Sequence, residues 1–206
     1  MIPDFILRNK LIDNIINLGR SKDFDERHAL DVNRIALAIF DQLQVLHRMG
    51  NTERLWLETA ALLHDVAKPK NRENHHKIAR DMIAGFTDLP FGTKERKIIG
   101  LIVRYHRGAL PDENHKYFRQ FDIESSEYIM KLASILRIAD GLVSGKSNIS
   151  SISCYIRDSE ITAYLKCTGN ISFAKIMKKA DLFEKVFGKS FILNMKIIPD
   201  SVLSDT

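Results

Sequence analysis

The spacing of apolar residues constrains this fold more than any other feature of the sequence. In five segments, apolar residues recur every three or four positions, which places their side chains on one face of an α-helix. Each of these apolar stripes has a histidine or an aspartate at one end. These polar residues are His28, His64, His75, His106 and Asp140. The sequence therefore predicts a mainly α-helical protein in which side chains of metal-ligand type face a common core.

His28 lies at the N-terminal end of the first of these stripes. Residues at helical spacing run from Val32 to Leu46, and a step of four residues back from Val32 reaches His28. A capping pattern, Asp23-x-x-Glu26, predicts the start of this helix just before the histidine. We therefore expect His28 on the buried face, near the first helical turn.

In the later stripes, helical steps of three or four residues also lead to a histidine or an aspartate. Leu57 and Ala61 lead to His64, and Lys68 lies a further four residues along if the helix persists. The stripes before His106 and Asp140 are also spaced by three or four residues; they are Ile99 and Ile102, and Ile129, Ala133 and Leu136. Each polar residue is thus predicted to lie on a buried helical face.

Two adjacent histidines, His75 and His76, compete for one inward position. From His75 the helical steps fall on Ala79, Met82 and Phe86, whereas from His76 they lead to Arg80. We therefore prefer His75 as the inward residue and keep His76 as the alternative.

A metal centre explains these residues better together than singly. One core histidine is more often bonded to a backbone carbonyl, but a buried aspartate is costly without a cation or a donor. His64 is followed directly by Asp65, so that one short stretch offers an imidazole and a carboxylate. Several imidazoles and two carboxylates in one core suit Mn²⁺, Fe²⁺, Co²⁺, Ni²⁺ or Zn²⁺.

The ligand set can hold one or two ions. We predict a first site built from His28, His64, Asp65 and Asp140. A second ion would be held by His75 (or His76) and His106, with Asp65 as the carboxylate between the two ions. Paired ions of this kind stabilise in-line displacement at phosphorus.

Basic residues near these ligands predict contacts with a phosphate. Lys68 follows Asp65 by three residues and begins a basic loop that runs to Arg72, while Arg104 and Arg107 flank His106. We assign catalytic roles to Asp65 and Lys68. Substrate contacts are assigned to Lys68, Arg72, Arg104 and Arg107.

Composition limits the class of protein. The 206 residues suffice for one domain, or for one domain with a small appendage, and 45% hydrophobic with 28% charged residues is typical of soluble globular chains. Charged residues interrupt every apolar run before the ~18 residues of a membrane span, and the first residues do not resemble a secretory signal. Two cysteines cannot form a disulfide framework, which favours a reduced, cytoplasmic protein.

The net charge of +5 suits an anionic partner, although lysines and arginines also solvate helix surfaces. No arginine-rich arm, zinc-finger spacing or RNP motif is present, so we do not expect nucleic-acid binding.

The pattern changes after Gly145. Residues 152–156 and 161–168 alternate and are rich in isoleucine, tyrosine and threonine, a helix is expected over 173–187, and residues 191–198 again favour a strand. We therefore divide the chain into a helical domain, 1–145, and a small β-β-α-β unit, 146–206, packed on it.

These residues carry a resemblance to known families. The order His28, His64-Asp65, Asp140 resembles the HD superfamily of metal-dependent phosphohydrolases. Within it, the chain is most similar to the C-terminal HD region of the exopolyphosphatase and guanosine pentaphosphatase (Ppx/GppA) family. The segments that carry this likeness are 34–43, 60–66, 75–77, 101–107 and 135–142. The resemblance implies an HD helical core and, often, a homodimer.

The sequence supports two functions from different classes and, less strongly, a third. The leading hypothesis is a metal-dependent phosphohydrolase that attacks a nucleotide, a polyphosphate or another phosphate ester or anhydride with a metal-activated water. The alternative is a non-catalytic module that binds polyphosphate or a nucleotide, because catalysis in the resembling family belongs to actin-like domains that this sequence does not contain. A third, weaker option is a structural protein whose histidines are core residues.

Overall fold

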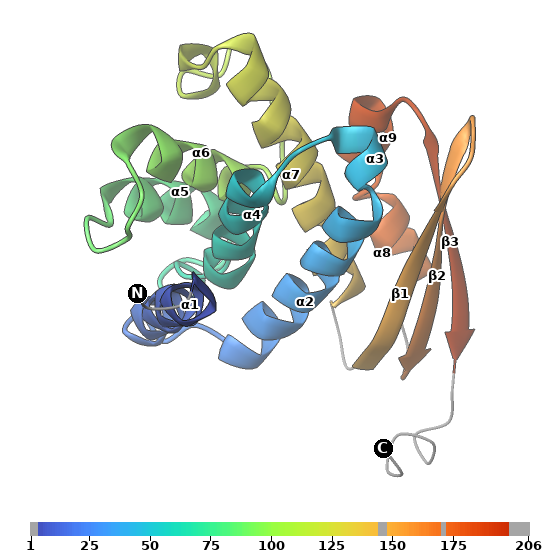
Figure 1. The fold of residues 1–206 in the computed structure, drawn as a ribbon, viewed down its shortest axis with the longest axis horizontal. Coiled ribbons are helices and arrows are strands. Elements are labelled where there is room, and N and C mark those ends of the chain that lie inside the picture. Colours follow the sequence, from blue (N-terminus) through green and yellow to red (C-terminus); the bar gives the residue numbers. More distant parts are fainter. Residues whose placement is uncertain (1–3, 144–147, 170–171, 198–206) are drawn as a thin grey trace.

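The computed structural model describes residues 4–143, 148–169 and 172–197. Helices make up most of the described chain, and a three-stranded sheet lies near its C-terminal end (Figure 1). The helices of the first part are α1 (Asp4–Arg20), α2 (Glu26–Gln42), α3 (Gln44–His47), α4 (Asn51–Leu63), α5 (His75–Gly85), α6 (Thr93–Arg104), the 3₁₀ helix η1 (Phe118–Gln120) and α7 (Ile123–Leu142). The strands and helices that follow are β1 (Asn148–Ile156), β2 (Glu160–Thr168), α8 (Phe173–Met177), α9 (Asp181–Phe187) and β3 (Ser190–Ile197). The predicted fold class, mainly α with a small β unit, is confirmed.

The start of α2 differs from the prediction by two residues. The N-cap is Asp25, whose carboxylate accepts a hydrogen bond from the backbone N–H of His28 at 3.0 Å. Asp23, which was predicted to cap the helix, instead has a positive φ of 57° in the preceding turn. The cap satisfies an otherwise unpaired backbone donor of the first helical turn and fixes the backbone at His28.

Helix α4 ends earlier than the stripe through Lys68 requires. Its last residue is Leu63, and the chain continues through tight turns in which the N–H of Lys68 bonds to the carbonyl of Asp65 at 2.8 Å. The condition under which Lys68 would share the stripe, that the helix persists to it, is therefore not met. The turn holds His64 and Asp65 at the helix end, where both are buried.

A single hydrophobic core joins the helices to the sheet. Helix α7 is buried along most of its length and contacts α2, α4, α6, α8 and α9. Side chains from the sheet, including Ile149, Leu165 and Phe191, belong to the same cluster of buried residues as those of the helices. Figure 1 shows the strands on one side of the molecule, with β1 facing α2 and with α8 and α9 near α7.

The sheet has the order β1-β2-β3, with β1 and β2 antiparallel and β2 and β3 parallel. The parallel pair requires a crossover connection, which is usually helical. The sequence predicted one helix here, over 173–187, but the crossover consists of α8 and α9 with a turn between them. The residues between Met177 and Asp181 therefore do not follow the helical periodicity that a continuous helix would impose.

The proposed division between residues 145 and 146 falls within 144–147, which lie outside the described residues, as does residue 198 of the third predicted strand. The division into two units therefore stays a prediction. Among the described residues, none of the helices combines the length and the apolar character that a membrane span requires.

Candidate metal centre

The predicted ligands come from the ends of five helices. His28 lies in the first turn of α2, His64 directly follows α4, and His75 is the first residue of α5. His106 lies two residues after α6, and Asp140 lies in the last turn of α7. Because these ends meet within the helical core, side chains far apart in the sequence form one buried cluster.

The first group consists of His28, His64, Asp65 and Asp140. The Nε2 atoms of the two histidines are 3.2 Å apart, and Oδ1 of Asp140 lies 3.3 Å from Nε2 of His28 and 3.6 Å from that of His64. Oδ2 of Asp65 lies 3.7 Å and 3.5 Å from the same two nitrogens. Bonds of about 2.1 Å to one metal place neighbouring ligand atoms about 3.0–3.4 Å apart, and the distances here lie within that range or a few tenths of an ångström above it. His28, His64 and Asp65 can therefore hold one ion, with Asp140 beside both histidines.

The second group consists of Asp65, His75 and His106. Their candidate ligand atoms all lie within 4.8 Å of one another. Nε2 of His75 is buried and has no hydrogen-bond partner, although it lies 3.0 Å from Oδ1 of Asp65. Asp65 belongs to both groups, as a carboxylate bridging two ions would.

Backbone hydrogen bonds set the orientation of three imidazoles. Nδ1 of His64, His75 and His106 lies 2.7, 2.8 and 2.6 Å from the carbonyl of the residue three positions earlier. A carbonyl can only accept, so Nδ1 carries a proton in each ring, and Nε2 keeps a lone pair whenever the ring is neutral. These lone pairs point into the cluster, which is the tautomer and orientation that metal-binding histidines adopt.

The cluster holds its carboxylates ionised. Burial would raise the pKa of Asp65, but His64 and His75 outweigh it and the net pKa lies below its ordinary value. Burial also opposes ionisation of Asp140, yet His28 and His64 hold its pKa well below the usual range. For His64, burial lowers the pKa, whereas Asp140 and Asp65 raise it, and the net shift is upward. A proton and a cation therefore compete for the same anionic cluster.

His76, the alternative to His75, is buried beside the second group. Its ring centroid lies 5.7 Å from that of His75 and 6.4 Å from that of His106, and its Nδ1 has no hydrogen-bond partner. Burial, followed by the positive charge of Arg104, lowers the pKa of His76 to about 4. His76 is therefore neutral at physiological pH, and His75 is the one that reaches Asp65.

The predicted substrate contacts differ in their placement. Lys68 lies at the cluster, with Nζ 2.5 Å from Oδ2 of Asp65. Arg72 and Arg107 are exposed, and Arg72 supplies the carbonyl that orients His75. The guanidinium of Arg104 lies 5.3 Å from the ring centre of Tyr105. Lys68 is thus the cation of this set that contacts a predicted ligand directly.

The sequence did not indicate Lys179 as part of the centre, nor the partner of Arg137. Lys179, between α8 and α9, forms an ion pair with Oδ2 of Asp140. Arg137, one turn before Asp140, donates to the carboxylate of Asp181 at 2.9 and 3.0 Å, a partner that lies 44 residues away and that no local pattern indicates. The expected continuous helix over 173–187 placed Lys179 next to Ala180 and off the apolar stripe, so no local pattern marked it.

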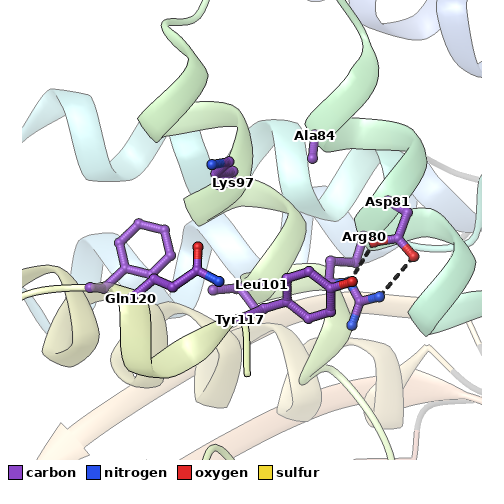
Figure 2. A pocket seen from close by; sticks show the side chains of 8 residues that line it. Arg80, Asp81, Ala84, Lys97, Leu101, Tyr117 and Gln120 are labelled. Atoms are coloured by element: carbon purple, nitrogen blue, oxygen red, sulfur yellow. Dashed lines mark hydrogen bonds and ion pairs between the residues drawn. The ribbon is translucent and has the colours of Figure 1, made fainter. Parts of the chain in front are cut away.

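A separate small cavity lies between α5, α6 and the segment around η1 (Figure 2). Its volume is about 130 Å³. Arg80 pairs with Asp81 and stands over the ring of Tyr117, 4.0 Å from its centre. The histidines and aspartates of the two groups are not among its lining residues. It therefore does not form part of the candidate metal centre.

The fold and the cluster define a helical protein with a buried histidine and aspartate centre suited to one or two metal ions. Comparison with protein families gives a more specific assignment. The family described as Ppx/GppA phosphatase, domain III, matches residues 12–167. The chain therefore belongs to this family. A search of the curated proteins finds no match to the chain.

Proposed function

We propose that the chain is a metal-dependent phosphohydrolase of the HD type, related to exopolyphosphatases. It would act on a nucleotide, a polyphosphate or another phosphate ester or anhydride. The observation that carries the proposal is the pair of ligand groups that share Asp65, with imidazole lone pairs directed into both. Membership of a phosphatase family supports the same reaction class.

We assign the residues of the centre two roles, metal coordination and phosphate binding. His28, His64, Asp65 and Asp140 would hold one divalent cation, and Asp65, His75 and His106 a second, drawn from Mn, Fe, Co, Ni and Zn. Such ions supply an acidified water as nucleophile and neutralise phosphate oxygens. Lys68, together with His64 and His75, favours the ionised form of Asp65 and would offer an ammonium to an incoming phosphate. Arg104, Arg107 and Arg72 would contact more distant parts of the substrate.

The proposal predicts metal-dependent turnover. Protein stripped with a chelator and reloaded with Mn²⁺, Co²⁺ or Ni²⁺ should hydrolyse at least one member of a panel of phosphate monoesters, diesters, nucleotides and polyphosphate. Asp65→Ala removes the carboxylate common to both groups, and we expect it to lower the rate by at least about a hundredfold. Initial rates measured with and without metal test this.

Asp88→Ala provides the matched control, because Asp88 is exposed and lies outside both ligand groups. It should retain the wild-type rate. Equal activity of the stripped and the reloaded protein would contradict the proposal.

The match to one numbered domain of a phosphatase family favours a second candidate function. In that case, the chain binds polyphosphate or a nucleotide without turning it over. Lys68, Lys70 and Arg72 form a basic turn next to the cluster and would supply charge for such binding. Tight, salt-sensitive binding of polyphosphate, with no turnover under any metal of the series, distinguishes this function from catalysis.

Assembly and location belong to the same proposal. We propose a homodimer, as the family resemblance implies, and light scattering of the purified chain tests it. Cys154 and Cys167 are free thiols. This fits a reducing, cytoplasmic setting. We also propose that the chain divides into a helical HD domain over 1–145 and an α+β unit over 146–206. This division rests on the change of sequence pattern after Gly145.

A further inference from the structure

Lys179 brings the C-terminal part of the chain to the metal centre. Its side chain extends from the turn between α8 and α9 and pairs with Oδ2 of Asp140, leaving Oδ1 directed at His28 and His64. About a quarter of the Lys179 side chain is exposed (24%), against 16% for Asp140. The ammonium therefore lies at the boundary between the buried ligands and solvent.

The aliphatic stem of Lys179 packs against the last turn of α7 at Gly141. A Cβ added at Gly141 would lie 3.0 Å from Cδ of Lys179, so that the aliphatic stem lies against the backbone of the residue after Asp140. A contact this short requires the neighbouring side chain to move. Glycine at position 141 thus allows the lysine to reach the carboxylate.

A second ion pair fixes the segment that carries Lys179. Arg137, one turn before Asp140, donates two hydrogen bonds to Asp181, two residues after Lys179. The same guanidinium donates to the carbonyl of Tyr105 at 3.1 Å, next to His106. The Arg137 side chain is buried, with 4% of it exposed, whereas 43% of the Asp181 side chain is exposed, so the pair joins the core to the surface of the turn. The turn is therefore held at a defined position relative to the ligands.

The net charge of the centre indicates a role for Lys179 in anion binding. Lys68 pairs with Asp65 and Lys179 with Asp140, so these four side chains already balance one another. A divalent cation bound by the same carboxylates leaves a surplus of two positive charges, and two cations leave four. A partly buried surplus of this size favours an anion at the open side of the site.

We propose that Lys179 and Lys68 together form a phosphate-binding subsite at the edge of the metal centre, so that the C-terminal part of the chain contributes a substrate contact. This inference rests on the proposed function, because the surplus charge arises only when metal is bound. Lys179 lies beyond residues 12–167, the range that the family match covers. The contact is thus a feature of this chain that the match does not assign.

The test separates anion binding from metal binding in the full chain. Calorimetric titration with Mn²⁺ gives the metal affinity, and titration of the Mn²⁺-loaded protein with inorganic phosphate gives the anion affinity. For Lys179→Met we expect phosphate affinity to fall roughly tenfold to a hundredfold, the usual effect of losing a charged hydrogen bond. Mn²⁺ affinity should stay the same or increase, because a like charge beside the metal is removed.

Three variants complete the experiment. Lys179→Arg keeps the charge and should bind phosphate within a few-fold of wild type. Lys178→Met removes the exposed neighbouring charge and should change neither affinity. Gly141→Ala keeps every charge but crowds the stem of Lys179, so it should weaken phosphate binding less than Lys179→Met does. Thermal unfolding confirms that each variant is folded.

The outcomes separate the two proposals. Unchanged phosphate affinity in Lys179→Met, or a parallel loss of Mn²⁺ and phosphate affinity, overturns the subsite while leaving the metal centre intact. A wild-type chain that binds no Mn²⁺ overturns both.

Discussion

At the scale of single residues, the centre depends on where each imidazole carries its proton. Three backbone carbonyls, at Ala61, Arg72 and Val103, accept from Nδ1 and leave Nε2 for the cluster. Without a cation, Nε2 of His75 faces a carboxylate oxygen of Asp65 at 3.0 Å, and both atoms are acceptors. A proton or a metal ion between acceptors of this kind removes their repulsion, which is why acidity and metal binding are linked here.

This linkage predicts that metal affinity rises with pH. The pKa of His64 is raised by Asp140 and Asp65 against the opposing effect of burial, so protonated His64 persists to a higher pH than in an ordinary histidine. Metal binding requires the neutral ring. Affinity is therefore weakest below the raised pKa and strengthens as the pH increases through it.

Mn²⁺ titrations at pH 6 and pH 8 should show tighter binding at pH 8, with protons released to the buffer at the lower pH. A dissociation constant that does not change between the two would contradict the assignment of His64 as a ligand.

At the scale of helices, the centre requires close packing of the helices that carry its ligands. Helices α5 and α6, which bring His75 and His106, approach each other at Gly100, where a Cβ would lie only 2.8 Å from the backbone oxygen of Arg80. A backbone atom cannot yield as the end of a side chain can. The small residue therefore sets the separation of the two helices.

Gly100→Ala should separate these helices. We expect the free energy of unfolding to fall by about 1–3 kcal/mol, the usual cost of overpacking. Because His75 and His106 move apart, Mn²⁺ binding at the second group should weaken more than binding at the first. Urea denaturation and metal titration measure the two effects.

Gly85→Ala is the matched control, since nothing lies within 4 Å of a Cβ at that position in α5. It should alter stability by no more than about 0.5 kcal/mol. Equal effects of the two substitutions would show that the close contact does not determine the helix separation.

At the scale of the whole molecule, the cluster connects helices that are distant in the chain. A ligand that binds only the folded state stabilises it by about 2.7 kcal/mol at a concentration of 100 times its dissociation constant. For a chain of this length, that corresponds to an increase in melting temperature of roughly 5–10 °C. Thermal unfolding with and without Mn²⁺ should show this shift in the wild type.

Asp140→Ala should show a much smaller shift, because it removes a ligand of the first group and the partner of Lys179. If Mn²⁺ does not change the melting temperature of the wild type, the proposal that a bound metal holds the helix ends together is contradicted.

The sequence alone determined the helical character of the chain and the residues that could form the centre. Helical periodicity is local, so the apolar stripes indicate which face of each helix is buried, and the polar residue at the end of each stripe is placed with it. The apolar stripe also favoured His75 over His76, because adjacent positions on a helix point in different directions. In the structure, His75 is the one of the two that lies next to Asp65.

Only the tertiary structure decided how these residues combine. It brought Lys179 to Asp140 and Arg137 to Asp181, across 39 and 44 residues of sequence. Both contacts involve residues at the break between α8 and α9, and the first also involves the close approach of the Lys179 stem to Gly141. A pattern within one segment cannot specify such pairs, because their distance depends on the positions of all the elements between them.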